Sequence, residues 1–292
     1  LVGSEDVSGT PADHYRVTLM SAQEVGTAIR WAEAEGWNPG LHDATAFYAA
    51  DPGGFLAGQF HGETVATLSA VKYAEDFGFI GLYIVQPAYR GRGFGYALWE
   101  HALASLAGRN VGLDGVLAQQ DNYRLSGFRF AHRNIRYAGR SRNHRAPSPR
   151  AVPARQVAFG DLAAYDRAMF PAERDHFLRH WIGQDASHTW VIADGSRLLG
   201  YGTVRACRQG FKIGPLNADD EDVASELLET LTSALPDGSD LFLDVPEPNT
   251  AAIALAQARG MTPAFETARM YTGAFPALPL ARIFGITTFE LG

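Results

Sequence analysis

Apolar positions recur with helix or strand spacing in a first series of elements that ends near residue 138. Alternation over 15–20 predicts a strand. A helix with one buried face is predicted over 21–35, where a capping box (Ser21 and Glu24) precedes four apolar residues at helical spacing: Val25, Ala28, Ile29 and Ala32. The pattern then predicts a loop, a short helix, strands near 54–61, 64–73 and 78–85, a helix over 93–107, a strand over 111–117, a short helix over 119–126 and a strand over 128–138.

A second series repeats this order from about residue 155 onward. It predicts a strand at 155–159, helical pieces over 160–182, strands at 188–194, 197–206 and 210–214, a helix over 219–233, a strand at 240–245, a helix over 249–259 and strands at 262–273 and 283–290. Between the series, residues 141–155 are rich in Ser, Arg and Pro and have no apolar period, which is typical of a linker. The sequence therefore predicts a diverged duplication with two domains, 1–145 and 146–292.

Composition excludes several classes of protein. With 292 residues, 46% of them hydrophobic, the chain is globular rather than disordered. The net charge of −7 argues against a nucleic-acid partner, and we interpret the eight arginines of 124–150 as lying on a strand and a linker. No apolar run approaches the roughly 20 residues of a membrane span, and no N-terminal signal pattern is visible. A cytoplasmic protein without a membrane partner is expected.

Two rare residue types narrow the chemistry further. The single cysteine, Cys207, excludes an intramolecular disulfide and a cysteine-based zinc site, and it is expected to be a buried apolar residue rather than a nucleophile. Among the 25 basic residues only Lys72 and Lys212 are lysines, and neither precedes Ser or Thr, so the chain has no phosphate-binding P-loop. No metal site is predicted.

The most informative segment is a glycine-rich loop between a strand and a helix. An apolar strand ends at Val85, Pro87 follows, and RGRGFG (90–95) leads into the helix over 93–107. Helix N-termini expose unpaired N–H groups, glycines allow close backbone approach, and arginines add positive charge, so the loop suits a diphosphate. Two other interpretations are open. One is a dinucleotide fingerprint, although Tyr96 stands where its last glycine is expected, and the other is a turn with no ligand.

The same loop resembles the acyl-CoA pyrophosphate loop of the GNAT N-acetyltransferases, through Arg90-x-x-Gly93-x-Gly95 after a strand that ends Val-x-Pro. Downstream, Tyr123-x-x-x-Gly-Phe matches a second segment of that family. WNPGLHD (37–43), GLDGVLAQQDNY (112–123) and the closing FGITTFELG resemble two-domain GNAT proteins whose second domain is itself GNAT-like. The resemblance implies an α/β fold of two tandem domains, each a mixed, mostly antiparallel sheet flanked by helices.

The resemblance also implies a donor site and an acid. Acetyl-CoA would be the co-substrate, without a metal, and Tyr123 would donate a proton to the departing thiolate. Tyr123 could instead be an aromatic residue that packs the short helix against the sheet. The family usually has Asn seven residues before this Tyr, where this chain has Val116, so Asn122 is a guessed substitute. The implied cofactor-binding residues are Tyr83, Ile84, Val85, Arg90, Gly91, Arg92, Gly93, Phe94, Gly95, Tyr96 and Asn122.

The acceptor side is less defined. Trp37, Asn38 and Asp43 lie where the family forms its acceptor site, although a Pro-Gly turn with satisfied polar side chains explains them equally well. The strand over 78–85 offers no carboxylate as a general base. Asp43, Tyr73 and Asp114 are the candidates, and the amine could also lose its proton to solvent.

The second half lacks the loop's glycines and arginines. Four acids stand at 219–222, where a diphosphate would be repelled, and Ala256 occupies the tyrosine position. This half is expected to complete the acceptor site instead, with groups such as Trp181, Arg205, Asp244 and Tyr271. The predicted function is transfer of an acetyl group to the primary amine of a small molecule by direct attack. The alternative is a non-catalytic acyl-CoA-binding sensor, and the sequence defines neither the acceptor nor the oligomeric state.

Overall fold

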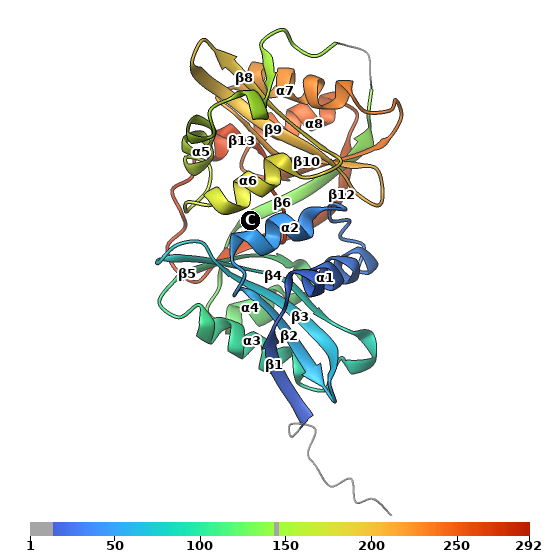
Figure 1. The fold of residues 1–292 in the computed structure, drawn as a ribbon, viewed down its shortest axis with the longest axis vertical. Helices are drawn as coiled ribbons and strands as arrows, with labels where there is room; N and C mark the ends of the chain where they lie inside the picture. Colours follow the sequence, from blue (N-terminus) through green and yellow to red (C-terminus); the bar gives the residue numbers. More distant parts are fainter. Residues whose placement is uncertain (1–13, 143–145) are drawn as a thin grey trace, which may run out of the picture.

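In the computed structural model, which describes residues 14–142 and 146–292, two lobes are stacked along the long axis of the molecule (Figure 1). The first half of the chain contributes β1 (Tyr15–Leu19), α1 (Ala22–Ala34), α2 (Asp43–Ala50), β2 (Phe55–Phe60), β3 (Glu63–Lys72), β4 (Phe77–Val85), α3 (Phe94–Ser105), β5 (Asn110–Val116), α4 (Gln120–Leu125) and β6 (Arg129–Arg140). The second contributes β7 (Ala151–Pro153), α5 (Phe159–Arg167), α6 (Asp175–Gly183), β8 (Ser187–Asp194), β9 (Arg197–Ala206), β10 (Phe211–Ala218), α7 (Glu221–Ser233), β11 (Asp240–Pro246), α8 (Thr250–Ala258), β12 (Thr262–Tyr271) and β13 (Ile283–Gly285).

One sheet runs through both lobes, in the order β1-β2-β3-β4-β5-β12-β6-β11-β10-β9-β8-β7, with β13 paired to β10. The last long strand of each half is exchanged. Strand β12 pairs with β5 of the first half, while β6 pairs with β11 of the second half. Strands β12 and β6 are antiparallel neighbours at the junction. Neither half therefore completes its sheet with its own strands.

The fold class is confirmed. Among the described strands only β4 with β5 and β10 with β11 pair in parallel, so the sheet is mixed and mostly antiparallel, with helices on its faces. Helix α1 begins as the sequence predicts, with both hydrogen bonds of the Ser21–Glu24 capping box present. The predicted stripe of Val25, Ala28, Ile29 and Ala32 is the buried face of that helix.

For three strands of the second half, the predicted bounds are wrong. The strand expected at 155–159 is found earlier, as β7 (Ala151–Pro153). It ends there because Pro153 has no N–H to continue the ladder, and residues 154–156 form a 3₁₀ turn. The strand expected at 210–214 continues to Ala218, because β10 finds a second partner in β13. The strand expected at 283–290 ends at Gly285. Part of the predicted linker, 143–145, lies outside the described residues.

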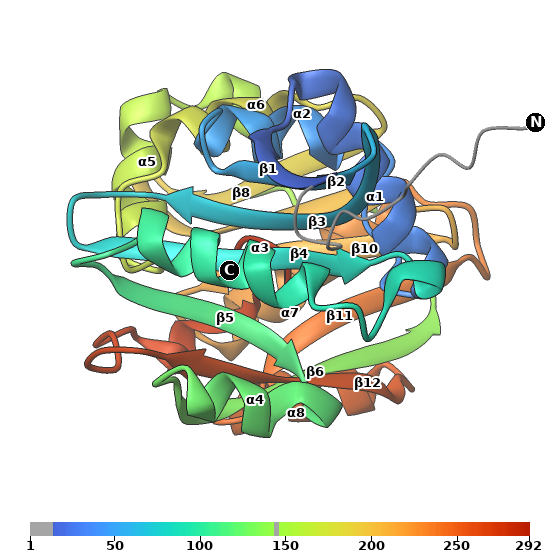
Figure 2. The same ribbon diagram turned by 90° about the horizontal axis from the view of Figure 1, so that it is seen from below.

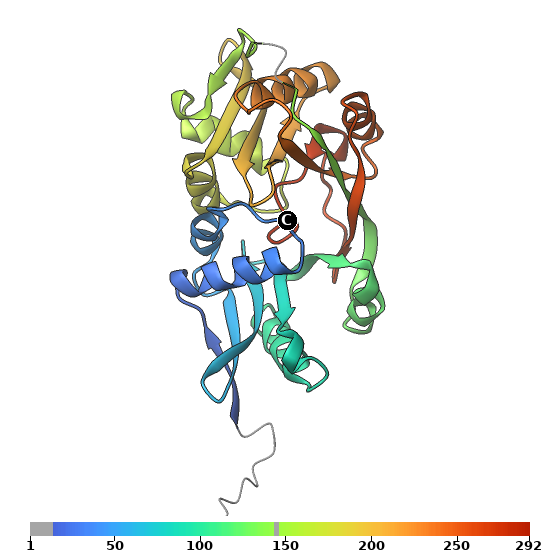
Figure 3. The same cartoon turned by 90° about the vertical axis from the view of Figure 1, so that its right-hand side faces the viewer.

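Residues 286–292 form a closing segment that runs from the second lobe into the junction, so the C-terminus lies between the lobes (Figures 1 and 3). Leu291 is 1% exposed and packs in the core of the first lobe with residues of α1, α2 and β4. Its carbonyl accepts a hydrogen bond of 2.9 Å from the Tyr73 hydroxyl, and its N–H donates to the Thr288 hydroxyl. Leu291 is therefore part of the hydrophobic core of the first lobe.

Within residues 14–142 and 146–292, no helix is both long and apolar enough to span a membrane.

Candidate active site

Strands β4 and β5 separate toward their carboxyl ends, and the space between them is the candidate site. They pair only over residues 77–80 and 110–113 and diverge beyond (Figure 2). A cavity of about 450 Å³ opens there, a volume suited to a small ligand. Its walls are residues 80–85 of β4, residues 113–116 of β5, Tyr123 of α4, and four residues of the second half: Phe265, Thr267, Phe289 and Glu290.

A β-bulge shapes the β4 wall. The register with β3 shifts between Thr67 and Ser69, and Leu82 has a left-handed φ of +48°. That conformation is strained for a leucine, and a hydrogen bond of 3.0 Å from the Thr67 hydroxyl to the Leu82 carbonyl stabilises it. Because β5 diverges from β4 there, residues beyond Ile80 have no partner strand on that side in the part of the chain that the structure describes. Their backbone is available to a ligand.

The glycine-rich loop follows β4 and leads into α3, and its Arg90 lines the cavity. Gly91 and Gly93 have φ of +76° and +84°, values that favour glycine. Gly93 is the N-cap of α3 and has no side chain to cap the helix, so the first N–H groups of α3 remain available. A Cβ at Gly95 would lie 2.7 Å from the Tyr83 hydroxyl, so this glycine allows α3 to pack closely on β4.

The two arginines of the loop are braced by protein groups. The Arg90 guanidinium pairs with Glu35 at 2.5 Å and donates to the Val85 carbonyl at 2.9 Å. The Arg92 guanidinium lies over three aromatic rings, 4.8 Å from the centroid of Phe60 in the nearest case. These contacts hold both guanidinium groups of the loop in defined positions.

Two phenols line the cavity. The Tyr123 ring lies against Gly115 of β5, where a Cβ would be 2.2 Å from a ring carbon, and beside Trp99. Burial raises the pKa of Tyr123 to about 12, and the neighbouring Tyr83 adds to the shift. Burial likewise raises the pKa of Tyr83 to about 12. Both hydroxyls keep their protons near neutral pH and can donate them.

Comparison with known proteins identifies the family of this chain. The profile of the acetyltransferase (GNAT) family matches residues 23–128, and that of an acetyltransferase (GNAT) domain matches residues 162–285. Holothin acyltransferase of Pseudoalteromonas sp. (strain SANK 73390) is 30% identical over 93% of this chain and 92% of its own length. This chain belongs to the GNAT family. It has two GNAT domains and is an acyltransferase.

Solved structures agree on the GNAT fold. A protein from Pyrococcus horikoshii, described as a candidate acetyltransferase, superposes with a TM-score of 0.82 at 19% identity and covers 100% of this chain and 99% of its own. A tandem GNAT protein from the clavulanic acid biosynthesis pathway gives a TM-score of 0.60 at 15% identity, covering 89% and 99%. The tandem arrangement thus recurs across distant sequences.

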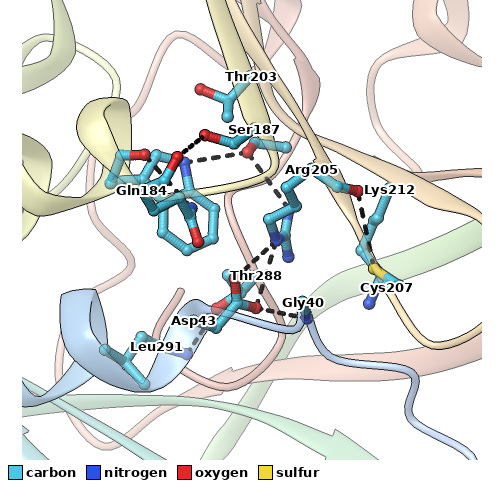
Figure 4. A network of polar contacts seen from close by, with 12 residues as sticks. Gly40, Asp43, Gln184, Ser187, Thr203, Arg205, Cys207, Lys212, Thr288 and Leu291 are labelled. Carbon is cyan, nitrogen blue, oxygen red and sulfur yellow. Dashed lines mark hydrogen bonds and ion pairs between the residues drawn. The ribbon is translucent and has the colours of Figure 1, made fainter. Parts of the chain in front are cut away.

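Of the predicted acceptor residues, Trp37 lines the GNAT cavity, whereas Asn38 and Asp43 are not among its lining residues. The Asn38 amide donates to the Gln209 carbonyl and accepts from the Gln209 N–H, at 3.0 and 3.1 Å. The Asp43 carboxylate binds Arg205 at 3.0 Å and the Gly40 N–H at 2.7 Å (Figure 4). Both residues join the two lobes.

The predicted cofactor-binding residues divide in the same way. Tyr83, Ile84, Val85 and Arg90 line the cavity, as does Val116, which stands at the family's Asn position. Residues 91–95 of the loop are not among its lining residues. Tyr96 is 64% exposed and lies outside the cavity. The exposed Asn122 amide donates to Gln119 at 2.6 Å and does not line the cavity either.

All three candidate bases already have protein partners. Asp114 lines the cavity, but its carboxylate accepts from Arg269 at 2.9 and 2.6 Å and from Asn134 at 2.7 Å. Tyr73 donates to the Leu291 carbonyl, and burial raises its pKa well above the ordinary value. Asp43 is bound to Arg205 as described.

The second-half groups named from the sequence form the junction rather than the cavity. Trp181 donates to the Gly214 carbonyl at 3.2 Å, Asp244 binds Arg136, and the Tyr271 hydroxyl accepts from Arg269. Burial raises the pKa of the Cys207 thiol, in keeping with an unreactive buried cysteine.

Sequence reasoning missed the four cavity residues of the second half, above all Glu290. Its only signal was a single acid in an otherwise uncharged closing segment, FGITTFELG. Nothing local to that segment shows that it enters the first lobe.

In the second lobe the equivalent gap is filled by the chain itself. Strands β10 and β11 are parallel over 211–213 and 241–243, after which β10 pairs with β13. A Cβ at Gly214 would lie 2.5 Å from the Thr287 carbonyl oxygen. At the start of α7, the Asp220 carboxylate accepts from the Val223 N–H at 2.9 Å, which takes up an amide that a diphosphate would need.

Proposed function

We propose that this protein transfers an acetyl group from acetyl-CoA to the primary amine of a small molecule, with Tyr123 as general acid. The observation that carries the proposal is the arrangement of one cavity. Arg90 of the glycine-rich loop lines it, the edge of residues 81–85 that faces away from β3 forms one wall, and Tyr123 lies on the other wall. These are the parts that acyl transfer from a thioester requires.

The chain's groups have distinct tasks in this proposal. The loop amides from Arg90 to Gly95 hold the diphosphate, and the free edge of β4 pairs with the pantetheine amides. A backbone N–H of β4 stabilises the developing oxyanion. The amine nitrogen attacks the carbonyl carbon directly, the C–S bond breaks, and the thiolate takes the Tyr123 proton, so no covalent enzyme intermediate forms.

The cavity favours a small acceptor with an apolar body. Trp37, Phe265 and Phe289 provide aromatic surface in its lining, and aromatic side chains bind flat organic groups well. The relative with 30% identity is named for holothin. Holothin is therefore a first acceptor to test, together with arylalkyl amines.

Turnover is tested by following release of the CoA thiol from acetyl-CoA with holothin, tyramine and tryptamine as acceptors. We expect acceptor-dependent thiol release and an N-acetyl product in mass spectrometry. Binding of acetyl-CoA without release of thiol by any amine would instead favour a non-catalytic acyl-CoA sensor.

Calorimetry with CoA is expected to give one site per chain, because β13 fills the second lobe's gap and α7 begins with acids.

Gly93→Ala should weaken CoA binding at least tenfold, since it disturbs the left-handed N-cap of α3. Gly108→Ala is the matched control: Gly108 has a φ of +83° beyond the other end of α3 and no atom within 4 Å of its Cβ position. Two comparable sites, or equal effects of both variants, would contradict the assignment.

A further inference from the structure

The closing segment places one carboxylate in the cavity. Glu290 is 3% exposed and lines the cavity beside β4. Neither of its carboxylate oxygens has a hydrogen-bond partner among the described residues. A buried carboxylate without a partner is costly to fold, so such a group is expected where a ligand completes it.

The backbone around Glu290 is built to hold it there. A Cβ at Gly81 would lie 1.9 Å from the Glu290 carbonyl oxygen, so only glycine at this point of β4 admits the segment. On the far side, Leu291 is buried in the first lobe and accepts from Tyr73, while its N–H donates to Thr288. These contacts leave the Glu290 side chain little freedom to turn away from the cavity.

Two basic side chains near Glu290, Arg136 and Lys212, form their hydrogen bonds with other groups. The Arg136 guanidinium binds both oxygens of Asp244 at 2.7 and 2.8 Å. The Lys212 ammonium donates to the Trp37 carbonyl at 3.3 Å. Burial and then Arg136 lower the pKa of Lys212. The other titratable groups of the cavity wall are Glu35, Tyr83, Arg90, Asp114 and Tyr123.

We propose that Glu290 binds the amino group of the acceptor and accepts its proton. This inference rests on the proposed function and supplies a general base, because the other candidates, Asp43, Tyr73 and Asp114, are already bound to other groups. As the C–N bond forms, the nitrogen acquires positive charge, and its proton passes to the Glu290 carboxylate. As the C–S bond breaks, the thiolate takes the Tyr123 proton. The base comes from the second half of the chain and the acid from the first.

The binding step can be tested without turnover. In the presence of saturating CoA, tyramine is expected to raise the thermal midpoint of the wild type, whereas 2-(4-hydroxyphenyl)ethanol, which replaces the amine by a hydroxyl, is expected to have a smaller effect. Glu290→Gln should abolish the difference between the two compounds. Glu266→Gln should preserve it, because Glu266 is a partly exposed neighbour of Phe265 and pairs with Arg133 at 3.4 Å. A wild type that does not distinguish amine from alcohol would overturn the proposal.

The chemical step is tested by pH profiles. With an amine that turns over, Glu290→Gln should lower kcat/KM at least 10²-fold and alter the fall in rate toward acid, since a base works only when deprotonated and only protonation of the amine itself then causes a fall. Glu290→Asp should recover part of the rate, and CoA binding should be unchanged in both variants. An unaltered profile in Glu290→Gln would overturn the inference while leaving the proposed function intact. Absence of CoA binding in the wild type would instead overturn the proposed function.

Discussion

Replacing Tyr123 by phenylalanine is expected to lower kcat about 10²-fold while the affinity for acetyl-CoA stays unchanged. The phenol lies in the cavity wall against Gly115, where phenylalanine can occupy the same volume. Burial raises the pKa of Tyr123 to about 12, so the hydroxyl is protonated and able to donate throughout the neutral range. The measurement is kcat and KM with a turned-over amine, together with calorimetry for CoA.

Tyr83→Phe is the comparison that identifies the acid. Tyr83 lines the same cavity, and its pKa is raised to the same value by burial. The loss of kcat should be larger in Tyr123→Phe. Because the pKa of Tyr123 is about 12, its ionisation should not reduce the wild-type rate below about pH 10. Unchanged turnover in Tyr123→Phe would assign this residue to packing alone.

Asp244→Asn is expected to destabilise the fold by about 3–5 kcal/mol, because it leaves a buried guanidinium without its counter-charge. Asp244 on β11 and Arg136 on β6 are 1% and 3% exposed, and this pair binds the exchanged strand to the second half. Asp240→Asn is the matched control on the same two strands. It faces Arg140 in a partly exposed pair, and pairs near the surface contribute about 0–1 kcal/mol. Urea unfolding of the three proteins gives the comparison.

The Asp244 effect should depend on pH in a defined direction. Burial alone would raise the pKa of Asp244, but Arg136, together with Lys212 and Arg205, holds the pKa below the ordinary value. A carboxyl with a depressed folded pKa stabilises the fold above its unfolded pKa and loses that effect as pH falls through the folded value. The difference between wild type and Asp244→Asn should therefore be full at neutral pH and shrink below about pH 4. A difference that grows on acidification would contradict this assignment.

Local patterns in the sequence were sufficient for most elements of the first half. The capping box, the apolar stripe of α1 and the left-handed glycines of the loop are each decided by neighbours within a few residues. The resemblance to GNAT proteins came from such local segments too. Where the second half was misjudged, at β7, β10 and β13, the outcome depended on which distant strand was available to pair.

Tertiary structure decided which side chains line the candidate site. The carboxylates of Asp43 and Asp114 could act as bases, but each accepts hydrogen bonds from an arginine more than 150 positions away in the chain, Arg205 and Arg269 respectively. Glu290 has no local feature that marks it, and only the packing of residues 286–292 against β4 brings it to the cavity.

The sequence by itself thus determined most helices and strands and the glycine-rich loop, because these follow from periodicity and short-range hydrogen bonding. Its local motifs carried the resemblance to the GNAT family. Only the tertiary structure decided the exchange of β6 and β12, the filling of the second lobe's gap and the partners of the buried charges. Those depend on pairing and burial between residues far apart in sequence, where hydrogen bonding and desolvation are decided by the whole fold rather than by neighbours.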